Sequence, residues 1–224
     1  MTPAKKGRDI VSVTVRPRHR RQPEAIDGAE GNAQLTALTG AVLLIGFAVE
    51  GLTVVALHRL LALHFFLCML LIGPVALKIC STIYRFVRYY SGAEPYVRKG
   101  PPAPLLRLLG PFVIITSLTV LGTGVALAVV GPDQQGLWLL LHKASFVLWF
   151  GVMTIHVLAN AWRLPRILLG APGSEARRGG GAWIAAPCGR FRWLLVGTSL
   201  ASGLLIALLT IHLATPWIAR MTGH

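Results

Sequence analysis

The sequence predicts an all-α integral membrane protein, a bundle of five transmembrane helices, and three observations lead to this fold class. Of the 224 residues, 54% are hydrophobic and only 13% are charged. The charged residues lie in blocks that are separated by long apolar stretches. This pattern is typical of membrane proteins and not of soluble domains. Five of the apolar stretches are long enough, as helices, to cross a hydrocarbon layer about 30 Å thick.

The five predicted helices follow one another closely. They cover about residues 35–57, 60–86, 105–130, 137–162 and 193–218, inside a bundle of residues 35–219. The turn between the first two helices is so short that they must form an antiparallel hairpin. Within the second helix, Gly73-Pro74 predicts an interruption whose kink opens room between helices. Pro101, Pro102 and Pro104 predict a stiff turn into the third helix.

Small residues recur in the third and fifth predicted helices. They are Gly122 and Gly124 in the third helix and Gly197, Ser199, Ser202 and Gly203 in the fifth. Small side chains let two helices approach closely, or let a flat cofactor lie against the backbone. The sequence leaves both explanations open.

Basic residues are unevenly distributed along the chain. Residues 1–34 are predicted to be a disordered basic tail, and residues 163–192 a glycine-rich loop. These two segments, together with residues 85–107 around the connection of the second and third helices, hold eighteen Lys and Arg residues, whereas the opposite side has only Arg59 and Arg220. Cytoplasmic segments carry the excess of positive charge. The sequence therefore predicts a multi-pass protein of the inner (plasma) membrane, with the N-terminus and both long loops in the cytoplasm.

The composition also excludes several classes of protein. The predicted topology explains the net charge of +14, so no nucleic-acid partner is expected. Cys68, Cys80 and Cys188 do not make a disulfide framework. With only eight acidic residues and no nucleophile beside a paired base, nothing in the chain resembles a hydrolase. The partner that these features predict is membrane lipid, including anionic headgroups near the basic tail.

His142 and His156 are the most informative residues, because they lie fourteen residues apart on the fourth predicted helix. Fourteen helical residues turn by about 1400°, roughly 40° short of four full turns, and rise about 21 Å. Both imidazoles therefore point the same way from two depths of the membrane. This is the arrangement needed to ligate two haems stacked across a bilayer. The alternative is that one or both are polar side chains packed between helices.

The outer layer of the membrane offers more than one partner for His142. His64 lies at a similar depth in the second helix, and we expect these two histidines to ligate one haem b. His212 reaches nearly the same layer from the fifth helix, and His58 lies at its boundary. Six residues separate His58 from His64, so these two side chains point about 120° apart. Whether His58 or His212 replaces His64 as the ligand stays open.

Glu50 is an acidic residue in the same outer layer, where an ionised side chain usually has a function or a partner. We expect Glu50 to pair with Lys143 or Arg59 across helices. The alternative makes Glu50 part of an outer quinol or proton path. Lys143 and Arg59 are also the cations available to the two propionates of a haem.

Lys78 occupies the inner layer, fourteen residues after His64, where a histidine would complete a second pair of ligands. A lysine amine binds haem iron only when it is deprotonated, and Lys78 can instead extend towards the cytoplasmic face. Three interpretations follow. The first, which we favour, is a single outer haem with His156 in a structural or proton-handling role. The second is an inner haem ligated by His156 and an unusual residue, and the third is a quinone or a haem propionate held by His156 and Lys78.

Two motifs resemble those of membrane b-type cytochromes, the group that includes bacterial cytochrome b electron carriers and the cytochrome subunits of hydrogenases and formate dehydrogenases. The stretch His64–Cys68 is similar to a His-x-x-Leu-Gly ligand motif with Cys68 in place of the glycine, and His142 with His156 matches in the fourth helix. The stretches Leu77-Lys78, Tyr84–Tyr90 and His142–Phe146 also look like those of a group of bacterial membrane proteins. The resemblance covers the second to fourth helices, about half of the chain.

Membership of this group implies haem b inside the helical bundle and electron transfer to or from a partner enzyme or a quinone. The departures at Cys68 and Lys78 leave a second haem open. The function hypothesis is therefore a membrane electron-transfer protein, an electron-transfer subunit of an oxidoreductase, that passes electrons between a redox partner and a quinone pool. The competing hypothesis is a cofactor-free membrane anchor or interaction protein with structural histidines. The sequence leaves open whether the chain forms a homodimer or a larger complex.

Overall fold

The part of the chain that this computed structural model describes, which is residues 24–98, 100, 104–161 and 187–222, is almost entirely helical. Five of its helices are long and apolar enough to cross a membrane, as predicted. They are α1 (Glu24–Val55), α2 (Leu57–Tyr90), α4 (Pro104–Val130), α5 (Gln135–Ala161) and α8 (Pro187–Thr210). The shorter elements are α3 (Glu94–Arg98), the 3-10 turns η1 (Pro132–Gln134) and η3 (Ile211–Ala214), and α9 (Thr215–Thr222).

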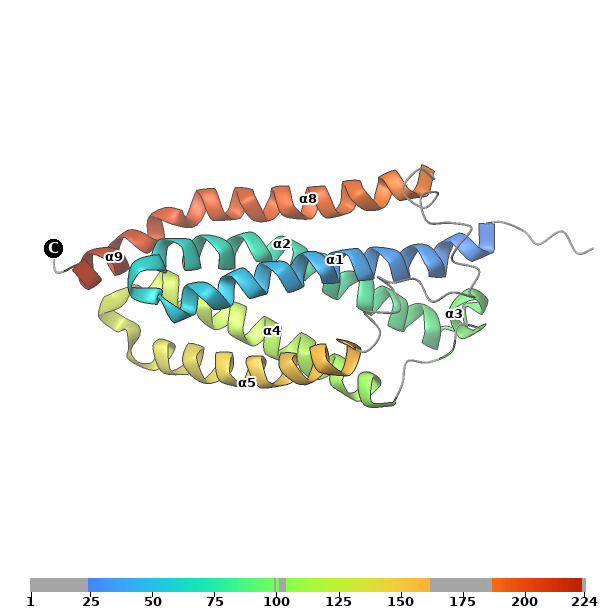
Figure 1. The fold of residues 1–224 in the computed structure, drawn as a ribbon, viewed down its shortest axis with the longest axis horizontal. Helices are drawn as coiled ribbons and strands as arrows, with labels where there is room; N and C mark the ends of the chain where they lie inside the picture. Colours follow the sequence, from blue (N-terminus) through green and yellow to red (C-terminus); the bar gives the residue numbers. More distant parts are fainter. Residues whose placement is uncertain (1–23, 99, 101–103, 162–186, 223–224) are drawn as a thin grey trace, which may run out of the picture.

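The long helices pack as two groups (Figure 1). Helix α2 packs closely against α1 on one side and α8 on the other, while α4 and α5 form an antiparallel hairpin. Among the described residues, no Cα atom of α5 lies within 8 Å of one in α1 or α2. Helix α5 therefore faces the first group across a layer of side chains, without close backbone contact.

Two small apolar clusters hold the bundle together. The first consists of Leu43, Leu71 and Val75 between α1 and α2, with the partly buried Phe47, Ile79 and Leu121 packed against it. The second consists of Met69, Ala128 and Ala207, which join α2, α4 and α8. Because α4 contributes Leu121 and Ala128 to these clusters, it connects the α4–α5 hairpin to the other three helices.

Helix α1 begins at Glu24, eleven residues earlier than predicted. Polar contacts with two neighbouring helices explain the difference: Asn32 Nδ2 donates a hydrogen bond to the Ser81 carbonyl over 3.1 Å, and Arg192 donates to Gln34 Oε1. Helix α8 likewise begins at Pro187, inside the predicted glycine-rich loop. The other parts of the predicted tail and loop, residues 1–23 and 162–186, lie outside the described residues, as do residues 101–103 of the predicted proline turn.

The predicted interruption at Gly73-Pro74 is not found, because α2 continues through Pro74 and its non-helical backbone angles lie at Leu60 instead. The two residues have another effect. A Cβ atom on Gly73 would lie 1.9 Å from the Ser199 carbonyl oxygen, and one on Gly203 would lie 2.0 Å from the Leu70 carbonyl oxygen. Proline cannot donate to the carbonyl four residues earlier, which here is Leu70. Gly73 and Pro74 thus allow α8 to approach α2 closely.

The two ends of the bundle differ. At one end, Arg220 of α9 donates a hydrogen bond to the Pro132 carbonyl and lies 3.7 Å from the Asp133 carboxylate, which joins the end of the chain to the α4–α5 connection. At the other end, α1 begins beside α3, which folds back after the last turn of α2 (Figure 1). The start of α1 and the end of α9 therefore lie at opposite ends, as an odd number of long helices requires.

Candidate functional site

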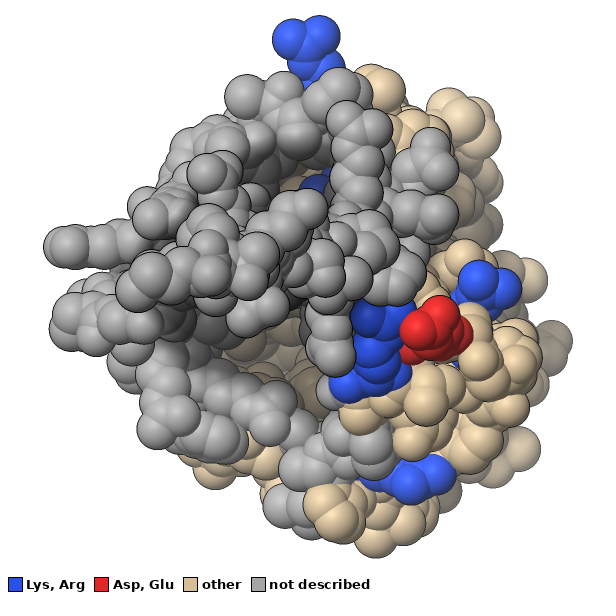
Figure 2. All heavy atoms as spheres, turned by 90° about the vertical axis from the view of Figure 1, so that its right-hand side faces the viewer, with Lys and Arg blue, Asp and Glu red and all other residues tan. Residues whose placement is uncertain are grey.

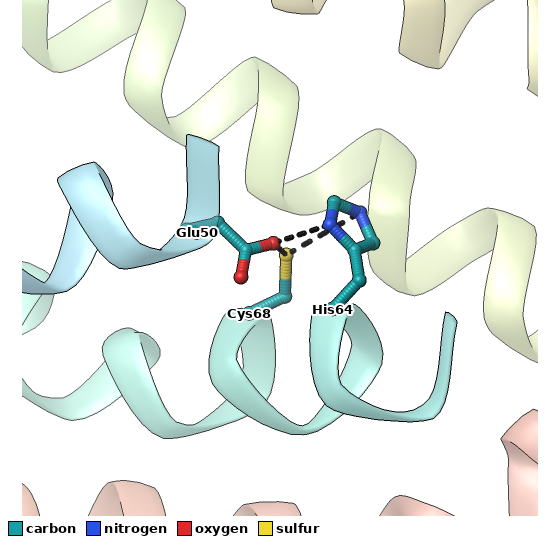
Figure 3. Close-up of side chains that lie close together, drawn as sticks. All are labelled: Glu50, His64 and Cys68. Carbon is teal, nitrogen blue, oxygen red and sulfur yellow. Dashed lines mark hydrogen bonds and ion pairs between the residues drawn. The ribbon is translucent and has the colours of Figure 1, made fainter. Parts of the chain in front are cut away.

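Three side chains with metal-ligating atoms meet between α1 and α2 (Figure 3). His64 Nδ1 lies 2.6 Å from Glu50 Oε1, and the Cys68 thiol donates a hydrogen bond to the same oxygen over 2.9 Å. His64 and Cys68 lie one helical turn apart on α2, so both face Glu50 of α1. Among the described residues, this is the one cluster of three or more His, Cys, Asp or Glu side chains with ligand atoms close together.

The short hairpin turn explains why these residues meet. Glu50 lies six residues before Ala56, at the turn, and His64 lies eight residues after it, so the two reach the same level on adjacent antiparallel helices. Thr53 adds a further contact, because its hydroxyl donates to the Glu50 carbonyl over 2.6 Å and its oxygen lies 3.0 Å from His64 Nδ1. The predicted pairing of Glu50 with Lys143 or Arg59 is therefore replaced by a buried contact with His64.

The contacts of His64 fix the tautomer of its imidazole. A carboxylate is an acceptor only, so the Nδ1 atom beside Glu50 carries the hydrogen. The lone pair then lies on Nε2, which is 3.9 Å from Cys68 Sγ. A second group that orients the ring in this way is typical of histidines that bind metals. His64 therefore presents Nε2 as its ligating atom.

His142 on α5 is held in the same manner by α4. Its Nδ1 lies 3.2 Å from Thr123 Oγ1, whose own hydrogen is donated to the Thr119 carbonyl over 2.8 Å. Thr123 is thus an acceptor for the Nδ1 hydrogen of His142. Ser145, one turn further along α5, lies 3.0 Å from the same hydroxyl and donates to the His142 carbonyl. With the Thr123 hydrogen on the Thr119 carbonyl, His142 carries its hydrogen on Nδ1 and its lone pair on Nε2.

The structure brings His64 and His142 towards each other from α2 and α5, within the range at which their charges interact. Gly124 makes room for the second ring, since a Cβ atom there would lie 3.1 Å from His142 Cε1. A Cβ atom on Gly51 or Gly122 would meet no neighbouring atom within 4 Å. Two oriented imidazoles on helices without close backbone contact, with glycines nearby, fit the needs of a flat haem with two axial histidines.

Lys78 on α2 and His156 on α5, the inner pair of the predicted topology, lie nearer the α3 end of the bundle than His64 and His142 do. The ammonium of Lys78 donates a hydrogen bond to the Thr36 carbonyl of α1 over 2.5 Å, so this side chain bonds within the bundle instead of extending to the end of α2. His156 lies within electrostatic range of that ammonium. Its Nδ1 atom is buried and has no hydrogen-bond partner among the described residues. An orphaned buried polar atom is costly, so a ligand that bonds to it would be stabilised.

Trp149 lies midway between the two histidines of α5, seven residues from each. Its ring packs edge-on against Phe47 of α1 with centroids 4.9 Å apart. Its Nε1 donates a hydrogen bond to Ser117 of α4 over 3.0 Å. This aromatic contact, which joins α1, α4 and α5, therefore lies between His142 and His156 along α5.

The other predicted residues lie outside these pairs. His58 and His212 are both exposed, so neither is oriented by the contacts that hold His64. Arg59 and Lys143, the expected partners of Glu50, are also exposed. Sequence reasoning missed the roles of Thr53 and Thr123, although counting residues from the second hairpin turn would have placed Thr123 level with His142.

No family model matches the chain, and no curated protein or solved structure matches it at a significant level. The site is therefore interpreted from its own geometry.

Proposed function

We propose that the protein is a membrane electron carrier that binds one haem b between α2 and α5, with His64 and His142 as the axial ligands. The observation that carries this proposal is that both imidazoles have a hydrogen-bond partner at Nδ1. Each gives its Nδ1 hydrogen to a neighbour, Glu50 for His64 and Thr123 for His142, and each keeps the Nε2 lone pair for iron. When bound, haem b supplies an iron that gains and loses one electron.

The chain itself has three tasks in this proposal. His64 and His142 fix the position of the haem, and the apolar helices exclude water from it. The Glu50 carboxylate, 2.6 Å from His64 Nδ1, makes that imidazole a stronger electron donor and so stabilises the oxidised iron. Arg59 and Lys143 are cations at the same end of the bundle that suit the two haem propionates.

The inner pair supports a quinone as the electron acceptor or donor. Lys78 and His156 present an ammonium and a buried imidazole nitrogen in the same layer. Both can donate hydrogen bonds to a quinone carbonyl, and His156 can also exchange a proton when the quinone, with two electrons and two protons, becomes a quinol. The electrons would pass between this layer and a redox protein at the opposite end.

The location proposed for the protein is the inner (plasma) membrane, with the N-terminus in the cytoplasm. Five long apolar helices fit a multi-pass membrane protein. Among the described residues, the end that holds α3 also carries Arg85, Arg88, Arg98 and Arg107, which favours that end as the cytoplasmic one.

A reduced-minus-oxidised visible spectrum of the purified protein tests the proposal, with haem supplied during expression. We expect a b-type α band, and pyridine extraction should give one haem per chain. Replacing His142 or His64 by alanine should remove this haem, whereas His58→Ala and His212→Ala should retain it. Absence of the α band from the wild-type protein would favour the cofactor-free anchor instead, and two haems per chain would show that the inner pair also binds one.

A further inference from the structure

A compact group of two arginines and two tyrosines lies where α2 ends and α3 folds back. Tyr84 and Tyr96 pack edge-on with ring centroids 6.2 Å apart. The Arg88 guanidinium lies over the Tyr96 ring, 5.9 Å from its centroid, and the charge of Arg85 also acts on Tyr96. We call these four residues the arginine–tyrosine cluster. It combines two cations with a rigid aromatic support.

The charges of this cluster are not neutralised within the described part of the chain. The nearby acid, Glu94, lies 2.7 Å from Arg98 and forms an ion pair with it. Neither Arg85 nor Arg88 makes an ion pair with a described carboxylate. Burial, and the hydrogen bond with Tyr84, raise the pKa of the Tyr96 phenol, so this ring adds no negative charge at neutral pH. Among the side chains that the structure describes, the two positive charges of the cluster therefore have no ion-pair partner.

Apolar side chains surround the two arginines. Those exposed on the same stretch of α2 and α3 are Ile83, Phe86, Val87 and Val97. Figure 2 looks onto this end of the molecule. Lys and Arg side chains lie on both sides of a group of acidic atoms there. A soluble anion would need only the positive charge. Positive charge, aromatic rings and exposed aliphatic groups together match a molecule with both a phosphate and acyl chains.

We infer that the arginine–tyrosine cluster binds the phosphate of an anionic phospholipid whose acyl chains lie along α2. Guanidinium groups form paired hydrogen bonds with phosphate oxygens. The tyrosine rings hold Arg88 in place, so less side-chain freedom is lost when the lipid binds. This inference is independent of the proposed haem, because none of the four residues contacts His64 or His142.

Native mass spectrometry of the full chain, released from micelles that contain equal amounts of phosphatidylglycerol and phosphatidylcholine, tests the inference. The wild-type protein should retain phosphatidylglycerol over phosphatidylcholine by about thirtyfold, since each of the two arginines near a lipid surface contributes about 1 kcal/mol. Equal retention of the two lipids would overturn the inference whatever the variants do.

Two double variants with the same loss of charge make the test specific. Arg85→Gln with Arg88→Gln should lower retention of phosphatidylglycerol on the order of thirtyfold. Arg59→Gln with Arg220→Gln, at the opposite end, should leave the retention unchanged. An equal loss of phosphatidylglycerol in both double variants would show that retention depends only on net charge, and would contradict a specific site. If the first variant fails to fold, Arg85→Lys with Arg88→Lys replaces it in the test. This variant keeps both charges and should keep the preference for phosphatidylglycerol. Loss of the preference would contradict the inference that positive charge causes it.

Added inorganic phosphate distinguishes a phospholipid site from a site for a soluble anion. We expect added phosphate to displace no more phosphatidylglycerol than sodium chloride does at the same ionic strength, because free phosphate gains nothing from the apolar surface. Selective displacement by phosphate would assign the cluster to a soluble anion instead. The haem content of the Arg85 and Arg88 variants, measured in parallel, should match that of the wild-type protein, so a failure of either proposal can be recognised separately.

Discussion

At the scale of single residues, hydrogen bonds to the Nδ1 atoms determine what His64 and His142 can do. Glu50 accepts one of these hydrogens and Thr123 accepts the other. The two acceptors differ in charge, so the two imidazoles differ in electron-donating strength. In the proposed haem site, His64 would be the ligand whose basicity Glu50 increases, and through which the protein adjusts the haem potential.

The sequence predicts His64 and His142 as site residues but does not predict the residues that contact them. Fourteen-residue spacing and depth depend only on helical geometry, which apolar helices follow closely. The partner of Glu50 depends instead on how α1 and α2 are rotated against each other. That rotation is set by packing around Leu43 and Leu71 and by the hairpin turn, and neither can be read from one helix alone.

Replacing Glu50 by glutamine keeps the shape of the side chain and removes its charge. We expect Glu50→Gln to raise the midpoint potential of the haem by about 60 mV, which corresponds to a roughly tenfold loss in preference for the oxidised iron. A potentiometric titration followed at the α band measures this shift. Asp133→Asn removes the same charge from an exposed position and is the control. An equal shift in both variants would contradict a direct effect through His64.

At the scale of helices, the closest contact in the bundle is the crossing of α2 and α8. Gly73 and Gly203 bring the two backbones together at this crossing. The expectation from sequence was that small residues serve either helix packing or a flat cofactor. The glycines differ in their surroundings. Gly203 allows close helix packing and Gly124 faces the His142 ring, whereas a Cβ atom on Gly122 or Gly197 would meet no atom within 4 Å. Their role depends on which helices become neighbours, and that is a property of the assembled bundle.

A methyl group added at this crossing should destabilise the protein. We expect Gly73→Ala to lower the free energy of unfolding by about 1–3 kcal/mol, because its Cβ atom would lie 1.9 Å from the Ser199 carbonyl oxygen and force the helices apart. Thermal unfolding in detergent, followed by circular dichroism, measures the change. Gly197→Ala on α8 is the matched control, and its melting temperature should stay at the wild-type value. A melting temperature of Gly73→Ala equal to that of the control would contradict this packing.

At the scale of the whole molecule, two groups of helices face each other across polar and aromatic side chains. Helices α1, α2 and α8 form one group, and α4 with α5 forms the other. The first group carries Glu50, His64 and Lys78, while the second carries His142, Trp149 and His156. The number of long helices could be predicted from hydropathy because each helix must cover the membrane alone. The grouping could not, because apolar composition hardly distinguishes one helix neighbour from another.

The orientation of this bundle in the membrane is open to a direct test. An alkaline phosphatase fused after His224 should be active, because the account places the C-terminus outside the cytoplasm. A fusion after Arg178, in the loop that carries many of the basic residues, should be inactive. Activity in the second fusion and none in the first would reverse the proposed orientation.

The central claim is that two imidazoles, from His64 and His142, ligate one haem. Near-infrared magnetic circular dichroism of the oxidised protein tests it most directly, because this spectrum identifies the axial pair of a low-spin ferric haem. The account predicts the signal of two histidine ligands in the wild-type protein, and its loss in both His64→Ala and His142→Ala. A thiolate or amine ligand signal in the wild-type protein, or a two-histidine signal that persists in either variant, would contradict the claim.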